Sequence, residues 1–123
     1  QVLQNLVIGR YAMSRNAGQR MIRDGGGSIV SIGSLASLTA MGRGHIAYSM
    51  AMGAVAQMTR ELSTEWATYG IRVNAILPAQ VTNPGLIKRM DEDPNLHHQF
   101  ISGIPIGRMG SPEEIKGIAV WLA

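Results

Sequence analysis

The chain has 123 residues, 46% of them hydrophobic and 15% charged, a composition that predicts one globular core and excludes a disordered protein. Its net charge of +3 comes from scattered Arg and Lys residues without a basic cluster, which argues against nucleic-acid binding. No apolar run is long enough for a membrane span, no signal-peptide pattern opens the chain, and the absence of cysteine fits a cytoplasmic protein without disulfides.

The first part of the chain predicts a helix, a turn and a strand. A long helix is expected from Val2 to Ile22, and the three glycines Gly25 to Gly27 predict a turn after it. The β-branched run from Ser28 to Ile32 predicts a short strand. A polar loop that holds Ser34 follows this strand.

The run from Ile46 to Tyr69 predicts a long amphipathic α-helix, because it lacks proline and spaces its apolar side chains by three to four residues. Gly70 stands where a left-handed C-cap is expected. The run from Ile71 to Leu77 then predicts a second strand that stops at Pro78. The order of helix, strand, helix and strand indicates βαβ winding, an α/β class and a parallel sheet.

The last third predicts three more helices. Within the segment 83–104, helices are expected over Leu86 to Met90 and Leu96 to Ile101, separated by a turn with an acidic cap from Asp91 to Pro94. A final helix is expected from Pro112 to Ala123. The histidines have no metal-ligand partners at useful spacing, so no metal site is predicted.

Tyr48 and Met52 form the most informative pair in the chain. They are one helical turn apart, so both side chains lie on the same helix face. A free phenol has a pKa of roughly 10, and an ammonium group at position 52 would favour the phenolate and make an acid/base pair. Methionine supplies no charge, so these residues look like an active site without its cation.

An ordered set of motifs carries a family resemblance. Gly27-Ser28-Ile29-Val30 with Ser34 at the strand end, Tyr48-Ser49 at a helix start, the run Gly70 to Pro78, and the run Pro105 to Ile115 follow one another over nearly the whole chain. This set resembles the C-terminal half of the short-chain dehydrogenase/reductase family, and its pattern is similar to the gluconate 5-dehydrogenase and polyol dehydrogenase branch. The resemblance implies a Rossmann-like, doubly wound parallel sheet.

The resemblance also implies roles for individual residues. Ser34 would hold the carbonyl or alcohol oxygen of a small sugar-like or acidic substrate, and Tyr48 would exchange a proton with that oxygen. The cofactor would be NAD or NADP, between which the chain does not discriminate. The lysine that hydrogen-bonds the ribose in the family falls at Met52. The remaining cofactor contacts would come from the loop after the second strand: Pro78, Val81, Thr82 and Asn83.

Each of these residues also has a structural interpretation. Ser34 suits a turn or cap, Tyr48 suits a helix start with its hydroxyl in water, and Met52 suits core packing. The downstream tyrosine and the family context favour the catalytic interpretation of Ser34 and Tyr48, whereas core or pocket filling is favoured for Met52.

Three positions depart from the family pattern besides Met52. A gapless alignment places Leu6 where the family has the asparagine of its proton relay, with Asn5 one residue early. One residue on a helix is a rotation of about 100°, so Asn5 is expected to face elsewhere unless the helix is locally adjusted. Ala79 replaces the glycine of a Pro-Gly turn and requires a negative φ. Asn83 stands at the threonine position, with Thr82 one residue early.

The resemblance bounds the domain. Residues 1–123 would be the C-terminal part of one Rossmann-type domain with a variable substrate lid at 83–104, and the nucleotide-binding half of the family is absent from the chain. Gly25 to Gly27 precede a strand and are therefore a turn and not a pyrophosphate cradle. Two functions stay open: an oxidoreductase impaired by Met52, and a non-catalytic relative kept for binding or assembly. In either case the resemblance implies a homo-oligomer, a dimer or tetramer, built through the two long helices.

Overall fold

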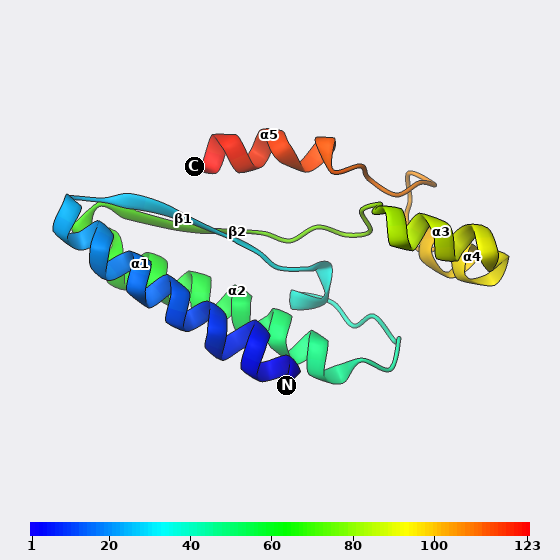
Figure 1. Cartoon of the computed structure of the whole chain (residues 1–123), viewed down its shortest axis with the longest axis horizontal. Helices are drawn as coiled ribbons and strands as arrows, with labels where there is room; N and C mark the ends of the chain where they lie inside the picture. The colour runs from blue at the N-terminus through cyan, green and yellow to red at the C-terminus, as the bar shows by residue number, and fades with distance from the viewer.

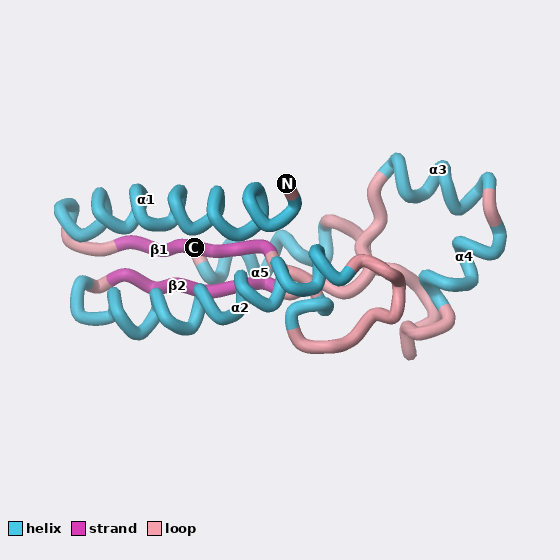
Figure 2. The backbone as a smooth tube through the Cα atoms, turned by 90° about the horizontal axis from the view of Figure 1, so that it is seen from below, coloured by secondary structure: helices cyan, strands magenta, loops and turns pink.

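The computed structural model describes residues 1–123 and confirms the α/β class with a parallel sheet. Helices α1 (Arg10–Asp24) and α2 (Ile46–Trp66) cover one face of the two-stranded sheet, and α5 (Glu113–Leu122) lies over the other (Figure 1). Figure 2 shows α3 (Pro84–Glu92) and α4 (Pro94–Ile101) beyond one end of the sheet. Helices on both faces of a parallel sheet are the layering of doubly wound folds.

The two strands pair in parallel and in register. Strand β1 (Gly27–Ile32) begins one residue earlier than predicted. Strand β2 (Ile71–Ile76) ends one residue earlier than predicted. Gly27 lies opposite Ile71 and Ile32 lies opposite Ile76, so both carboxyl ends reach the same edge of the sheet. This edge is where open α/β sheets bind their ligands.

The helix ends follow their local sequence signals. Helix α2 tightens into a 3₁₀ turn over Ala67–Tyr69 and stops at Gly70, whose φ of 70° confirms the expected left-handed cap. At the same end of the sheet, Arg72 donates hydrogen bonds to the carbonyls of Leu122 and Ala123 and so joins the end of α5 to β2. None of the helices is both long and apolar enough to cross a bilayer.

The first helix and the turn between α3 and α4 differ from the prediction. The first helix is not regular from Val2: a π-helical segment, Gln4–Gly9, precedes α1, which runs on to Asp24. Asp91, predicted to lie in a turn, belongs to α3, and the turn is reduced to Asp93, which accepts hydrogen bonds from the backbone of Asn95 and Leu96 at the start of α4. Local capping by Asp93 therefore starts α4 without ending α3 early.

The buried side chains form two small clusters along α2. One contains Leu62, Ile71 and Val73, with Trp66 packed against it, and holds the end of α2 on the sheet. Here Gly18 of α1 lies against the Trp66 ring, because a Cβ at this position would come within 2.6 Å of ring carbons. The other cluster contains Met52 and lies near the start of α2.

Candidate functional site

Ser34 is fixed at the carboxyl edge of the sheet by its two neighbours. The amide of Gly33 donates to the Ile76 carbonyl at 2.8 Å, and the amide of Leu35 donates to the Pro78 carbonyl at 2.9 Å. These bonds continue the pairing of β1 and β2 past the strand ends, so Ser34 lies beside the chain that leaves β2. Ser34 thus lies at the carboxyl edge of the sheet, as predicted from its position after the strand.

The Ser34 hydroxyl caps a turn as an acceptor and keeps its hydrogen available to donate. Its backbone is extended, and its Oγ accepts a hydrogen bond from the amide of Ala36 at 3.2 Å, which caps the 3₁₀ turn Leu35–Ser37. The capping interpretation of this serine is therefore realised. Since the hydroxyl acts only as an acceptor in this bond, its O–H remains able to donate to a ligand oxygen.

The loop that holds Ser34 packs on the helix that holds Tyr48. Ser37 donates from its Oγ to the Met52 carbonyl at 2.8 Å, which joins the loop to the second turn of α2. Tyr48, one turn earlier, is 36% exposed. Its ring meets the ring of His45 edge-on, with 5.6 Å between the centroids. The fold brings the two predicted catalytic elements together, although no hydrogen bond joins the two hydroxyls.

Met52 is a member of the apolar core. It is 2% exposed and shares a cluster with Ala36, Ala51 and Val55, against which Leu6, Val7 and Met41 pack. Its thioether offers neither a charge nor a strong hydrogen-bond donor. The packing agrees with the core interpretation of this residue.

The asparagine region is locally adjusted, and the adjustment does not bury Asn5. The segment Gln4–Gly9 is π-helical, a form that is rare and that often occurs at functional sites. Within it Asn5 is exposed, whereas Leu6 is half-buried and packs against the Met52 cluster. The side chains at the two relay positions, Leu6 and Met52, thus contribute to one apolar region.

The loop after β2 lines an apolar hollow of about 420 Å³. Pro78 and Val81 form one wall, and Ile115 and Ala119 of α5 form another, with Lys116 at the side. No non-glycine residue has a positive φ, so Ala79 makes its turn with the negative φ that it requires.

The side chains of Thr82 and Asn83 form hydrogen bonds within the protein. Thr82 donates from its hydroxyl to the Gly110 carbonyl at 3.3 Å, and its backbone amide donates to the same carbonyl at 2.9 Å. Asn83 is the N-cap of α3, where its Oδ1 accepts from the amide of Leu86 at 2.9 Å. The Asn83 amide nitrogen remains available to donate.

An ion pair lies on either side of Gly110, the residue to which Thr82 is hydrogen-bonded. Arg108 forms two bonds to the Glu114 carboxylate, each 2.9 Å, and the amide of Ser111 donates to the same carboxylate at 2.8 Å. These hydrogen bonds, first that of Arg108 and then that of Ser111, lower the pKa of Glu114 to about 2. The sequence reasoning missed this pair, although Ser111-Pro112-Glu113-Glu114 has the spacing of a capping box.

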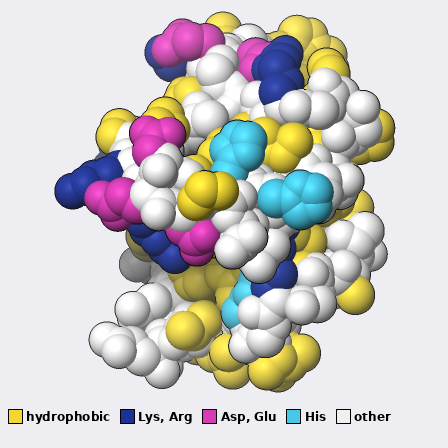
Figure 3. All heavy atoms as spheres, turned by 90° about the vertical axis from the view of Figure 1, so that its right-hand side faces the viewer, with side chains coloured by type: hydrophobic (Ala, Val, Ile, Leu, Met, Phe, Trp, Pro, Cys, Tyr) yellow, Lys and Arg dark blue, Asp and Glu magenta, His cyan; other side chains and the backbone are white.

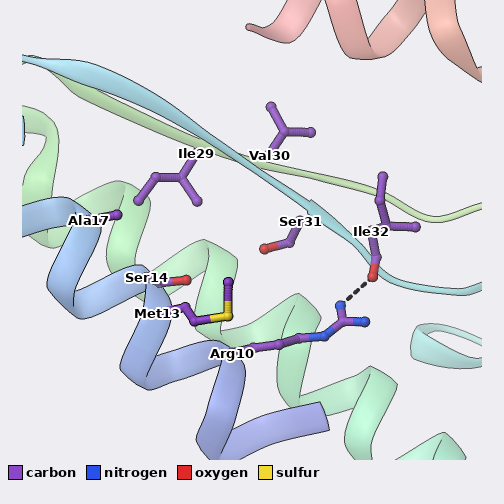
Figure 4. Close-up of a pocket in the computed structure, with 8 residues that line it drawn as sticks. All are labelled: Arg10, Met13, Ser14, Ala17, Ile29, Val30, Ser31 and Ile32. Carbon is purple, nitrogen blue, oxygen red and sulfur yellow. Dashed lines mark hydrogen bonds between the residues drawn. The ribbon is translucent and has the colours of Figure 1, made fainter. Parts of the chain in front are cut away.

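Arg10 was also missed. Figure 4 shows its side chain reaching from α1 to the Ile32 carbonyl at the carboxyl end of β1, across a hollow of about 370 Å³ lined by both elements. The guanidinium satisfies a carbonyl at the outer edge of the sheet. No local sequence signal marks this contact, because its partner lies 22 residues away.

Comparison with known proteins decides the family. A family model described as enoyl-(acyl carrier protein) reductase matches residues 1–123. The chain belongs to the short-chain dehydrogenase/reductase family. The matched range includes the serine loop, the tyrosine helix and the loop after β2.

The relatives of the chain include a polyol dehydrogenase and an inactive dehydrogenase of another substrate class. Galactitol 2-dehydrogenase (L-tagatose-forming) of Cereibacter sphaeroides is 40% identical over 125 residues, which cover 100% of this chain and 48% of that protein. An inactive 2-(S)-hydroxypropyl-CoM dehydrogenase of Xanthobacter autotrophicus is 35% identical and is matched over 94% of this chain and 51% of its own.

A solved structure shares the fold of the chain. A protein described as an NAD(P)-dependent gluconate 5-dehydrogenase from Beutenbergia cavernae, with bound NADP, superposes with a TM-score of 0.88 at 35% identity. The superposition covers 98% of this chain and 48% of that one. The chain spans about half the length of these relatives.

Proposed function

We propose that the protein is an NAD(P)-dependent oxidoreductase that interconverts a secondary alcohol and a ketone on a small sugar-like or acidic substrate, and that Met52 lowers its turnover. The observation that carries the proposal is the position of Ser34. Backbone bonds at 2.8 and 2.9 Å on either side hold it at the carboxyl edge of the sheet. Its loop packs on the helix that holds Tyr48.

The residues after β2 fit a nicotinamide ring. Pro78 and Val81 present an apolar wall to the hollow beside α5, which suits one face of a flat aromatic ring. The free amide nitrogen of Asn83 suits a carboxamide oxygen, whereas the Thr82 hydroxyl already donates to Gly110. Position 52 fits less well, because Met52 is buried and has no group for a ribose hydroxyl. When bound, NAD or NADP supplies the hydride chemistry.

The residues of the chain supply binding and proton transfer. Ser34 donates its free O–H to the substrate oxygen and orients it. Tyr48, partly exposed at the start of α2, gives a proton to that oxygen in reduction and removes it in oxidation. Met52 supplies no cation beside Tyr48 to assist this proton transfer, so slow turnover is expected.

A second candidate function is a non-catalytic role in binding or assembly. It is supported by the burial of Met52, which is 2% exposed, and by the inactive relative from Xanthobacter autotrophicus. On this alternative the protein binds the nicotinamide cofactor or a second copy of itself without turnover. Turnover of the unaltered protein discriminates between the two: slow turnover that depends on Tyr48 supports the oxidoreductase, whereas turnover at background that Met52→Lys raises by orders of magnitude supports a silenced site.

The first test is turnover in the intact protein. Absorbance of reduced nicotinamide is followed with polyols and sugar acids, including galactitol and gluconate. We expect slow turnover that Tyr48→Phe and Ser34→Ala lower by roughly 10²- to 10⁴-fold. Tyr69→Phe, at an exposed tyrosine at the far end of α2, is the matched control and leaves the rate unchanged. Rates that survive Tyr48→Phe would contradict the assigned proton donor.

The remaining features of the proposal concern the assembly. The protein is proposed to act in the cytoplasm as a dimer or tetramer through α1 and α2, with residues 1–123 as the C-terminal part of a Rossmann-type domain and 83–104 as its substrate lid. The two helices expose apolar side chains, including Tyr11, Met13 and Met50. Sedimentation of the intact protein measures the oligomeric state directly, and a monomer at micromolar concentration would contradict this part.

A further inference from the structure

The segment 40–45, between the serine loop and α2, contains one arginine, Arg43. Arg43 lies between Gly42 and Gly44, whose φ angles are 63° and 69°. Open space surrounds both glycines, so the left-handed backbone and not crowding requires them. The two left-handed positions direct the chain through a tight loop that presents Arg43.

Arg43 reaches α4, 57 residues further along the chain. Its guanidinium carbon lies 4.5 Å from the centroid of the Phe100 ring, a cation–π contact. Its Nη2 also donates to the Gln99 carbonyl at 3.4 Å. Figure 3 views the molecule from this end, where histidine and charged side chains gather.

This contact is the principal polar link between the lid and the rest of the site. Helices α3 and α4, called the lid pair from here on, lie beyond the end of the sheet (Figure 2). Among the hydrogen bonds of the chain, only that of Arg43 joins the lid pair to residues 1–82. The Lys88–Glu92 ion pair, by contrast, lies within α3.

The same loop contacts the candidate catalytic tyrosine. His45 donates from Nδ1 to the Arg43 carbonyl at 3.2 Å, and the His45 ring stands edge-on to Tyr48 at 5.6 Å. Contacts therefore run without interruption from Phe100 through Arg43 and His45 to Tyr48. We propose that Arg43 is a positioning residue that fixes the lid pair over the start of α2, and so sets how the lid meets a substrate beside Tyr48. This proposal rests on the proposed function only for its catalytic consequence.

Hydrogen exchange of the intact protein without ligand tests the tether by itself. Arg43→Ala and Phe100→Ala should each raise amide exchange in residues 94–101 by about two- to fivefold, the effect expected for an exposed cation–π contact. The double variant should show no more than either single one, because both remove the same contact. Lys88→Ala, a matched loss of one exposed cation on α3, should leave exchange in α4 unchanged. Unchanged exchange in Arg43→Ala, or independent effects in the double variant, overturns the tether.

Steady-state kinetics test the consequence for the substrate. Arg43→Ala should raise KM by a similar factor with little change in kcat, because the side chain acts on the lid and not on the reacting atoms. Arg43→Lys keeps a cation over the ring and should recover part of the loss. A loosened α4 with an unchanged KM overturns the positioning role. Failure of every substrate would count against the proposed function and leave the exchange result to decide the tether.

Discussion

Replacement of Met52 by lysine tests the proposal most directly, because Met52 is buried as well as uncharged. Met52 is 2% exposed, and Leu6 packs against its cluster. An ammonium group at this position would lose its hydration and gain no hydrogen-bond acceptor from the apolar side chains of the cluster. A buried group left unsatisfied costs about 1–3 kcal/mol, and more for a charge. We expect Met52→Lys to lower the free energy of unfolding by about 1–3 kcal/mol, and by less if the side chain extends to solvent.

A second substitution, Leu6→Asn, should recover part of the stability that Met52→Lys loses. Leu6→Asn adds a polar partner on the segment that packs against the same cluster. Coupling between residues in contact is about 0.5–3 kcal/mol, so the double variant should be more stable than the sum of the single effects predicts. The gain in turnover, on the order of 10²- to 10⁴-fold, should be larger in the double variant than in Met52→Lys alone.

Urea unfolding of the four proteins in this cycle measures the coupling, and nicotinamide absorbance measures turnover. Met52→Leu keeps an apolar side chain of similar volume, so it should cost less than about 1.5 kcal/mol and leave turnover unchanged. Val7→Asn, on the same π-helical segment, is the matched control for Leu6→Asn. The reasoning is refuted if Met52→Lys alone is as stable as the parent, or if Val7→Asn restores stability as well as Leu6→Asn does.

Three further predictions concern stability and are checked by urea unfolding. Gly18→Val should destabilise by about 1–3 kcal/mol, because its Cβ would meet the Trp66 ring at 2.6 Å. Asn83→Ala removes the N-cap of α3 and should cost about 1 kcal/mol, whereas Asn83→Asp should retain most of it. The pKa of Glu114 is lowered from 4.5 to about 2, so the unfolded chain binds the proton more tightly. The contribution of its pair with Arg108 should be complete above pH 4.5 and disappear as the pH falls toward 2, and Glu114→Gln should abolish this part of the pH dependence.

The predicted features of the site that the structure reproduces rest on short-range signals. Ser34 follows a β-branched run and therefore stands at a strand end, wherever the strand lies in the sheet. Asn83 was predicted only as a cofactor contact, but it precedes a proline and a helix, and its own side chain caps α3. Asp91 was misplaced because an acidic residue before Pro94 suits a turn and a helix end equally, and the continuing backbone bonds of α3 decided between them.

The sequence by itself determined the element order, the α/β class, the left-handed cap at Gly70 and the spacing of Tyr48 and Met52, since each depends on neighbours within a few residues. The tertiary structure decided which side chains are buried and which distant segments meet. Met52 joins the core because Leu6 and Met41 pack against its cluster, and Arg43 reaches Phe100 because a loop and a helix converge at one end of the sheet. Burial and long-range contacts depend on where the whole chain travels, which no local pattern specifies.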